Sequence, residues 1–594
     1  MTLHSFRGSR VWRSFLSLSL VPLFAFIFAE TTKGDVKLSG IFGDHMIMQE
    51  GAKLPVWGWA DPNEKVTVTL GKASASTIAG ADGTWRVDLP SVPQGGEPQV
   101  MTVEGKNTVT FQDVLVGDVW VASGQSNMQF GIHNDGRGDA AVAQADDPHI
   151  RLFMVPTATS LEPKSSFGTV SPDRLEAKWQ VCSPAILDGK WGWGGFSAAA
   201  YYFGREIHRV TGRPICLIDT SVGGTPAQAW TSLSGLQKEP ILAHYVADRQ
   251  KIVDNYEQAN AAYPKLKADF DAATQQWTQE VGTPFYQALE QWKIAAGKSS
   301  ATGQPIPPQP KPSRSKPTAP TPPDGGSHLP ATLFNGMVSP LIPYAIKGVI
   351  WYQGEQNSGN AKEYATLFPR VITDWREKWN QGDFPFLYVQ LASWGTPQKT
   401  PSEGGGWVLL REAQLKTLAV PNTGMATAID IGNPFDLHPK DKLDVGLRLA
   451  LAARRIAYGE NVVASGPIYN AMTVDGGTIR LTFKEIGSGL TMGVPPWTPT
   501  GTPTSPPSEL KGFAIAGEDR KWVWAKAEIK GNEVVVSAEA VASPTAVRYD
   551  WAPCPAGNLY NQEGLPASPF RTDDWDDAPP SQPKLPIPTS PVQP

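Results

Sequence analysis

Cysteine and histidine are scarce in this chain of 594 residues, which has only three cysteines and eight histidines. The cysteines, Cys182, Cys216 and Cys554, allow at most one disulfide bond and leave one thiol over, which excludes a disulfide-rich scaffold. No group of cysteines and histidines has the spacing of a zinc site. We therefore expect no metal and no disulfide framework.

Charged side chains are also few, at 18% of the residues, and the net charge is −5. This composition lacks the basic surface that nucleic-acid binding requires. An apolar run over 15–28, preceded by three arginines, is short for a membrane span and typical of an export signal. We predict a signal peptide over 1–29 and an exported, periplasmic or extracellular protein with no integral membrane span after signal removal. An uncleaved anchor is the alternative.

The chain is too long for a single hydrophobic core, and it is rich in tryptophan, glycine and proline. This profile is typical of a loop-rich enzyme with strand domains. Alternating runs at 66–70 and 85–89, separated by turns, predict an antiparallel β-sandwich over 36–112. We expect this unit to be structural, and a sugar-binding module is the alternative.

From residue 113 the pattern changes to strands that alternate with helices. An apolar strand at 114–122 ends at a turn that carries Ser126, and a long loop region is expected from there to about residue 195. A helix at 196–210 and a buried strand at 215–219 follow, and that strand runs into the turn at Gly223 and Gly224. This rhythm is typical of a parallel α/β sheet.

The same rhythm resumes after residue 330, with further strands and helices in alternation. Strands are predicted at 346–351, 386–391 and 424–431, and helices at 364–379, 407–418 and 442–458. We therefore assign the catalytic domain to 113–238 and 330–459. The intervening 239–329 is predicted to be an insertion, a polar helical hairpin or lid followed by a proline-rich tether, and we expect it to be a solvated excursion. A second β domain is predicted over 460–572 and a disordered tail over 573–594.

Polar groups follow four of the predicted strands. They are Ser126, the Gly223–Gly224 pair, Asn357, and Asp436 with His438. Because the carboxyl ends of parallel strands meet at one edge of the sheet, we expect these groups to converge. A serine hydroxyl becomes a nucleophile only when a base takes its proton, and a histidine is a suitable base.

The expected roles follow from this chemistry. His438 would accept the Ser126 proton and later give it to the leaving alcohol, and Asp436 would hold the imidazole and offset its charge. The backbone N–H groups of Ser126 and of the glycine pair, with the Asn357 amide, would bind the oxyanion. Losing one such donor costs roughly 100- to 1000-fold in rate.

The motifs around these residues resemble a known family. Gly-Gln-Ser-Asn-Met at 124–128, Gly-Gly-Thr-Pro-Ala-Gln-Ala-Trp at 223–230, Trp-Tyr-Gln-Gly-Glu-Gln-Asn at 351–357 and Asp-Leu-His-Pro-Lys at 436–440 are similar to blocks of the sialate O-acetylesterases. These are SGNH-type carbohydrate esterases, named for their Ser, Gly, Asn and His. The resemblance covers most of 36–572 and leaves out the insertion.

The resemblance implies an SGNH-hydrolase (flavodoxin-like) α/β fold, a parallel sheet with helices on both faces, flanked by N-terminal and C-terminal β domains. It also implies hydrolysis of O-acetyl esters on a sugar or glycan substrate through an acyl-serine intermediate, without a metal or other cofactor. Many SGNH hydrolases place the acid three residues before the histidine, where this chain has Phe435. Asp436 is thus one candidate acid, and Glu355, Asp430 or a backbone carbonyl are the others.

We expect an exported serine esterase, foremost a sialate O-acetylesterase. The alternative with another substrate is an acetylxylan esterase or other polysaccharide deacetylase, because its serine motif is similar. A non-catalytic carbohydrate-binding protein is the alternative of another class, but a binding module needs neither Ser126 nor His438. A serine peptidase fits less well, because Asn127 and Met128 follow the serine where a nucleophile elbow needs a glycine.

Overall fold

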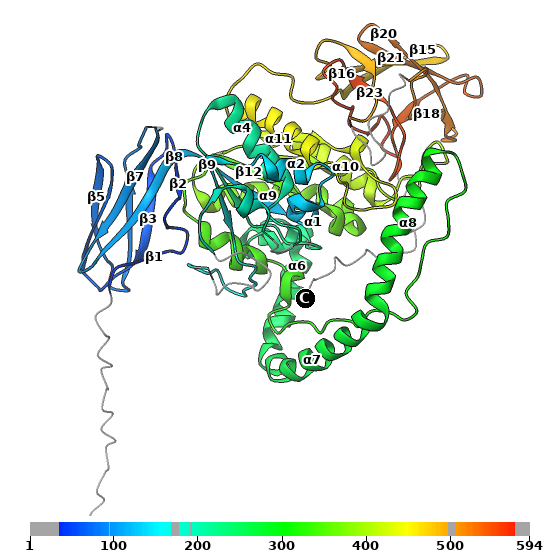
Figure 1. Cartoon of the computed structure of the whole chain (residues 1–594). Helices are drawn as coiled ribbons and strands as arrows, with labels where there is room; N and C mark the ends of the chain where they lie inside the picture. Colours follow the sequence, from blue (N-terminus) through cyan, green and yellow to red (C-terminus); the bar gives the residue numbers. More distant parts are fainter. Residues whose placement is uncertain (1–34, 94, 168–176, 190–192, 497–506, 576–594) are drawn as a thin grey trace, which may run out of the picture.

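The computed structural model describes residues 35–93, 95–167, 177–189, 193–496 and 507–575. A central α/β body lies between an N-terminal and a C-terminal β unit (Figure 1). The predicted export signal and nearly all of the predicted tail fall outside the described residues. All three cysteines are buried and free. A search of the helices in the described ranges finds none with the length and hydropathy of a bilayer-spanning segment.

The α/β body is built on a large mixed sheet. Its main path runs β10-β9-β11-β8-β12-β13-β14, and every neighbouring pair except β10 with β9 is parallel. The strands are β8 (Thr108–Gly124), β9 (Asp147–Met154), β10 (Gln180–Cys182), β11 (Ile215–Asp219), β12 (Gly348–Tyr352), β13 (Phe386–Gln390) and β14 (Thr423–Thr427).

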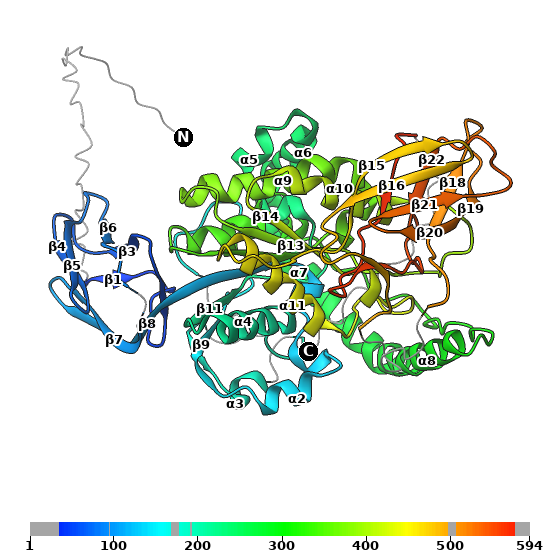
Figure 2. The same ribbon diagram turned by 90° about the horizontal axis from the view of Figure 1, so that it is seen from above.

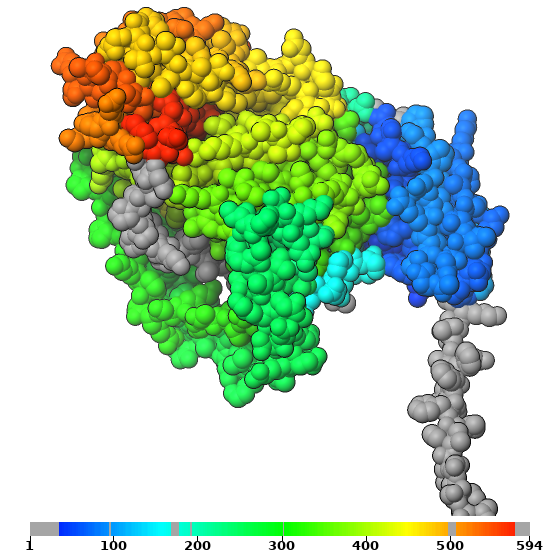
Figure 3. Space-filling model, turned by 180° about the vertical axis from the view of Figure 1, so that it is seen from behind, coloured from blue at the N-terminus to red at the C-terminus, as the bar shows by residue number. Residues whose placement is uncertain are grey.

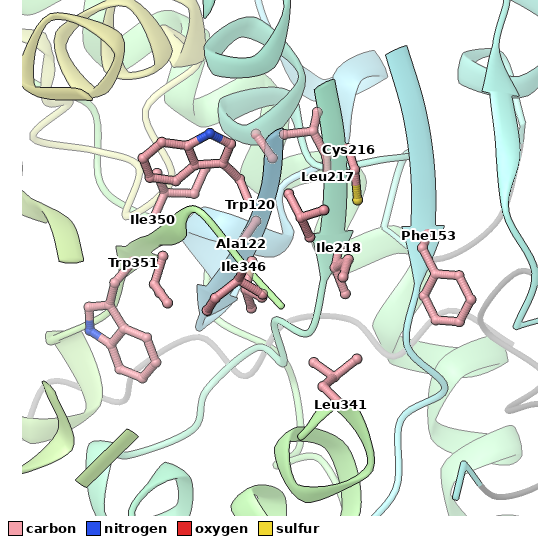
Figure 4. Packing of buried hydrophobic residues seen from close by; sticks show 14 of the residues in the cluster. Trp120, Ala122, Phe153, Cys216, Leu217, Ile218, Leu341, Ile346, Ile350 and Trp351 are labelled. Atoms are coloured by element: carbon pink, nitrogen blue, oxygen red, sulfur yellow. The ribbon is translucent and has the colours of Figure 1, made fainter. Parts of the chain in front are cut away.

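Strand β8 links the N-terminal unit to the body. Its first part pairs with β7 (Gly95–Glu104) and alternates between exposed and less exposed residues, whereas residues 114–124 are all buried. In the body β8 lies between β11 and β12, and Figure 4 shows Trp120 and Ala122 packed among apolar side chains of those strands. After β8 the chain builds one side of the sheet and later returns to build the other, so the strand order reverses at β8, where open α/β sheets bind their ligands.

Helices cover both faces of this sheet (Figure 2). On one face α4 (Ala198–Thr211) packs beside α11 (Lys442–Ile456), and on the other α9 (Ala361–Trp379) packs beside α10 (Gly406–Lys416). Helix α4 begins where the Ser197 hydroxyl accepts a hydrogen bond from the Ala200 amide, a common N-terminal cap. The predicted helices at 196–210, 364–379, 407–418 and 442–458 are confirmed within a few residues at their ends.

The predicted loop region between Ser126 and residue 195 is wrong, because it contains β9 and β10, two strands of the main sheet, and the short helices α2 (Gly138–Ala143) and α3 (Pro184–Leu187). Arg151 interrupts the apolar run of β9 and hides the pattern. The side chain is nevertheless buried, since its guanidinium pairs with Asp113 at 2.9 Å. Strand β9 and the short strand β10 extend the sheet beyond β11.

The flanking units are made of antiparallel strands with few exceptions. The N-terminal unit contains β1 (Lys37–Leu38), β2 (Ile47–Gln49), β3 (Leu54–Trp59), β4 (Lys65–Leu70), β5 (Ala73–Ile78) and β6 (Thr84–Leu89), with β7 and the start of β8. The C-terminal unit contains β15 (Ile468–Asp475), β16 (Thr478–Lys484), β17 (Leu490–Met492), β18 (Phe513–Ala516), β19 (Val523–Trp524), β20 (Lys526–Lys530), β21 (Glu533–Ser537), β22 (Ala546–Tyr549), β23 (Leu559–Asn561) and β24 (Phe570–Arg571). It has its own hydrophobic core.

The segment predicted as an insertion is helical and then extended. It contains α6 (Ala243–Asp254), α7 (Tyr256–Trp277), a π-helical turn (Thr278–Gly282) and α8 (Thr283–Ala301). The indole N–H groups of Trp277 and Trp292 donate to the carbonyl oxygens of Arg314 and Pro307, at 3.0 and 2.8 Å, and so hold the proline-rich return segment against the helices. Figure 3 shows this segment in green, standing out from the body between the blue and the orange-red β units.

Candidate active site

Ser126 lies directly beyond the carboxyl end of β8. Gly124 has φ +134, and a Cβ there would lie 2.2 Å from the Tyr352 carbonyl oxygen, so only glycine allows this close approach of β8 to β12. Ser126 then opens the short helix α1 (Ser126–Gln129) and is only 3% exposed. The turn therefore fixes the hydroxyl at the sheet edge.

His438 reaches Ser126 from the loop between β14 and α11. Its Nε2 lies 2.9 Å from Ser126 Oγ, so the structure brings together two residues that are 312 positions apart. The imidazole packs edge-on against Trp193, with ring centroids 4.5 Å apart, and is stacked with Phe130 at 6.4 Å. These contacts hold the ring in a position from which it can accept the serine proton.

The surroundings of His438 favour its neutral form. Burial, followed by the positive charges of Lys442 and Lys293, lowers the pKa of His438 from 6.5 to about 3. Desolvation and nearby cations both disfavour an imidazolium. At neutral pH the ring is therefore unprotonated at one nitrogen and can act as a base.

Asp436 lies close to His438 without bonding to its ring. Its Oδ1 is 3.8 Å from His438 Nδ1, beyond hydrogen-bond distance, and accepts a 3.1 Å hydrogen bond from the His438 backbone amide. Its Oδ2 accepts from Lys293 Nζ of α8 at 3.0 Å. The carboxylate thus shapes the histidine loop and is shared between a histidine and a lysine.

The two other candidate acids are engaged elsewhere. Glu355 is buried, and its Oε1 accepts a 2.5 Å hydrogen bond from Asn127 Nδ2. Desolvation raises the pKa of Glu355. Asp430 forms a two-pronged ion pair with Arg448 at 2.6 and 2.7 Å. Neither pattern of contacts includes His438, so Asp436 is the candidate acid nearest to the imidazole.

Lys442 is a site residue that sequence reasoning missed. Its buried Nζ donates to Asn127 Oδ1 at 2.8 Å and to the Pro439 carbonyl at 2.6 Å. Asn127 also donates to the Leu437 carbonyl at 3.2 Å, so the serine turn and the histidine loop share one network. Burial lowers the pKa of Lys442 to about 7. The available signal was a lysine at the first position of a helix, where the helix dipole disfavours a cation.

The glycine turn lies against the serine. A Cβ on Gly223 would lie 3.4 Å from Ser126 Cβ. The Gly223 N–H donates to Gln129 Oε1 at 2.7 Å, and Gly224 follows with φ +71. The turn is therefore adjacent to the nucleophile, and the Gly223 N–H already binds an oxygen of the carbonyl type, that of the Gln129 side-chain amide.

Asn357 lies in the turn after β12 and is held by several hydrogen bonds. It is 1% exposed, and its Nδ2 donates to Gln228 Oε1 at 3.0 Å and to Asn360 Oδ1 at 3.4 Å. Its Oδ1 accepts from the Ala227 amide at 2.9 Å. The Asn357 side chain therefore contacts the segment after the glycine turn, and its role as an oxyanion donor stays a prediction.

His438 lies in a cavity of about 1010 Å³. Six aromatic side chains line it, and they are Phe130, Trp193, Tyr286, Trp292, Trp394 and Phe435. Helix α8 contributes Tyr286, Trp292 and Lys293, and Trp292 packs edge-on against Phe435 at 5.6 Å. The expectation that the insertion is only a solvated excursion is therefore wrong, because its last helix forms a wall of the cavity.

Comparisons with known proteins indicate the family of the chain. A family model described as "Carbohydrate esterase, sialic acid-specific acetylesterase" matches residues 331–455. The sialate O-acetylesterase of Pongo abelii is 30% identical over 75% of this chain and 76% of its own, and that of Mus musculus is 28% identical over 90% and 94%.

A solved structure gives the same result. The crystal structure of a carbohydrate acetylesterase from Xanthomonas citri has 34% sequence identity and a TM-score of 0.69, over 91% of this chain and 100% of its own. The serine–histidine pair, the family match and these relatives agree. The chain belongs to the sialate O-acetylesterase family of carbohydrate esterases and is a carboxylic ester hydrolase.

Proposed function

We propose that this protein removes O-acetyl groups from sialic acids, with Ser126 as nucleophile and His438 as general base. The contact that carries the proposal is the 2.9 Å approach of His438 Nε2 to Ser126 Oγ beside an aromatic cavity. A serine paired with a neutral imidazole is the minimal arrangement for acyl transfer. Family membership supports the choice of an acetyl ester.

In the first step Ser126 Oγ attacks the acetyl carbonyl carbon while His438 Nε2 takes the hydroxyl proton. The negative charge develops on the carbonyl oxygen, which the backbone N–H groups of Ser126 and Gly223 would stabilise. The Gly223 N–H now donates to the Gln129 side-chain oxygen, so the oxyanion would take the place of that oxygen. Gly224 follows in the same turn with φ +71.

The tetrahedral intermediate then collapses to the acetyl-serine as the bond from the carbonyl carbon to the sugar oxygen breaks, and the His438 imidazolium gives its proton to that oxygen, so the sugar leaves with a free hydroxyl. A water molecule then attacks the acetyl-serine, and His438 takes its proton before returning one to Ser126 Oγ, which releases acetate. The charge on the imidazolium is opposed by Asp436, whose Oδ1 lies 3.8 Å from Nδ1. Apo distances of this kind shorten in reacting complexes.

The cavity supports a sugar of the sialic acid type in two ways. Its aromatic walls suit the apolar faces of a sugar ring, and few polar groups are needed to fix orientation. Lys440 lines it and is exposed, so a cation is available to a sialate carboxylate, whereas Lys293 is paired with Glu290 and Asp436. A neutral acetylated xylan would use the aromatic walls without the cation.

The test measures acetate release from O-acetylated sialic acid and from acetylated xylan, side by side, with Ser126→Ala as the control. We expect serine-dependent release from the sialate, and Lys440→Gln should raise KM for the sialate alone. Release from xylan only would keep the mechanism and change the substrate. Absence of release from both would contradict the proposal in favour of a binding function.

We also propose the SGNH-type (flavodoxin-like) arrangement for the α/β body. Without β9 and β10 at the edge, the order β11-β8-β12-β13-β14 corresponds to the 2-1-3-4-5 order of flavodoxin-like sheets. Export is a further proposal, based on the apolar run at 15–28. Cell fractionation with and without residues 1–29 tests it, and cytoplasmic retention of the full chain would contradict it.

A further inference from the structure

Three metal-ligating side chains gather at the corner between β9 and α4. Asp147 and His149 lie at the start of β9, and His208 lies in the last turn of α4. One potential ligand atom from each side chain lies within 4.8 Å of the other two. We propose that these three residues bind a divalent transition-metal cation, with zinc as the fitting chemistry, and this site is independent of the esterase reaction.

The distances are close to those of a bound ion. His208 Nε2 is 3.4 Å from Asp147 Oδ2, and His149 Nδ1 is 3.9 Å from Asp147 Oδ1. Ligands held tetrahedrally at about 2.0–2.1 Å from zinc are roughly 3.4 Å apart. The two imidazoles now stack with ring centroids 5.7 Å apart, and side-chain rotations that turn one nitrogen of each ring toward Asp147 would give three ligands of one ion.

The orientation of the ligands is fixed by a second layer of contacts. His208 Nδ1 lies 2.5 Å from the Arg213 carbonyl oxygen, and donating its proton there leaves the Nε2 lone pair facing Asp147. A metal-bound histidine usually makes this kind of contact through its other nitrogen. Asp147 Oδ1 accepts from the His149 backbone amide at 2.9 Å, which holds the carboxylate in place.

The donor set indicates the class of ion. Two imidazoles and a carboxylate suit zinc and its neighbours, whereas calcium and magnesium prefer oxygen ligands alone. The side chains of His149, Asp147 and His208 are 41%, 28% and 21% exposed, so water can complete the coordination. A cation at the C-terminal end of α4 is also favoured by the helix dipole.

The position of the cluster points to a structural role. In the parallel register Ile150 of β9 and Asp118 of β8 both lie level with Ile215 of β11, so Asp147 is at the amino end of the strands. Ser126 lies beyond the opposite, carboxyl end of β8. An ion here would join β9 to α4 and to the loop at Arg213, and would stabilise the fold without touching the substrate.

Isothermal titration of ZnCl₂ into the tag-free, EDTA-treated full chain tests the site. We expect saturation at one zinc per chain, and a loss of affinity of roughly tenfold or more in His149→Ala and in His208→Ala. The matched control is His244→Ala, which removes one member of a two-residue pair with Glu363 and should bind zinc normally.

Esterase activity and circular dichroism verify that each variant is folded. If His208→Ala does not fold, the zinc affinity of His149→Ala, which removes the more exposed ligand, tests the site. Failure of the wild-type chain to bind zinc would overturn the site, and so would unchanged affinity in a folded His149→Ala. Because the readout is zinc binding, this result is independent of the substrate.

Discussion

Asp436 and Lys293 form a charge pair beside the candidate base. Neutralising each residue alone, and then both together, tests how the imidazolium is stabilised. Asp436 Oδ1 lies 3.8 Å from His438 Nδ1. At that separation, and at an effective dielectric constant of about 20, an opposite charge contributes up to about 4 kcal/mol, or roughly 1000-fold in rate. Lys293, 3.0 Å from Asp436 Oδ2, opposes part of this effect.

We therefore expect Asp436→Asn to lower kcat/KM by roughly 10- to 1000-fold, because it removes the anion and leaves the Lys293 cation facing the imidazolium. Asp436→Asn should also lower the pKa of His438, whereas Lys293→Met should raise it. Burial and the cations of Lys442 and Lys293 lower that pKa to about 3. Removing one cation raises the pKa, so the acidic limb of kcat/KM moves to higher pH. The double variant should be more active than Asp436→Asn alone.

The assay is kcat/KM for p-nitrophenyl acetate across the acidic and neutral range. Asp269→Asn, which breaks an exposed helical pair with Lys265, is the matched control and should change nothing. An Asp436→Asn enzyme with the wild-type rate and the wild-type acidic limb would refute the reasoning. So would a double variant no more active than the single Asp436→Asn variant.

Three further predictions concern the site. Ser126→Ala and His438→Ala should each abolish most esterase turnover with unchanged unfolding curves, and retained activity in either would contradict the mechanism. Gly124→Ala should destabilise the fold by about 1–3 kcal/mol in urea unfolding, because its Cβ meets the Tyr352 carbonyl at positive φ, and wild-type stability would contradict this strain. Trp292→Ala should raise KM for the acetylated sugar and leave p-nitrophenyl acetate hydrolysis unchanged, whereas equal effects on both would exclude a role in sugar binding.

The convergence of Ser126 and His438 could be predicted because it follows from topology. Strand ends were visible as apolar runs that stop at polar turns, and parallel strands bring their carboxyl ends to one edge. The same reasoning placed Asp436 close to His438 and the Gly223 turn close to the serine, and the structure has both there.

Other features depend on packing that no local pattern encodes. Sequence could not show that Asn357 gives its amide to Gln228, because a buried amide has several possible partners within reach. The composition of α8 predicts a helix but not the surface on which it packs, so its place at the cavity was missed. Arg151 made β9 look like a loop, because its pairing with Asp113 is invisible in the linear order.

The central claim is that Ser126 is the nucleophile and that His438 activates it. Labelling with a fluorophosphonate tests this directly, because the reagent traps the serine in a stable ester instead of a transient acetyl-serine. We predict one label per chain, on the peptide that contains Ser126, with esterase activity lost in proportion, and little labelling in His438→Ala. Full activity in the labelled protein, or a label on another residue, would contradict the account.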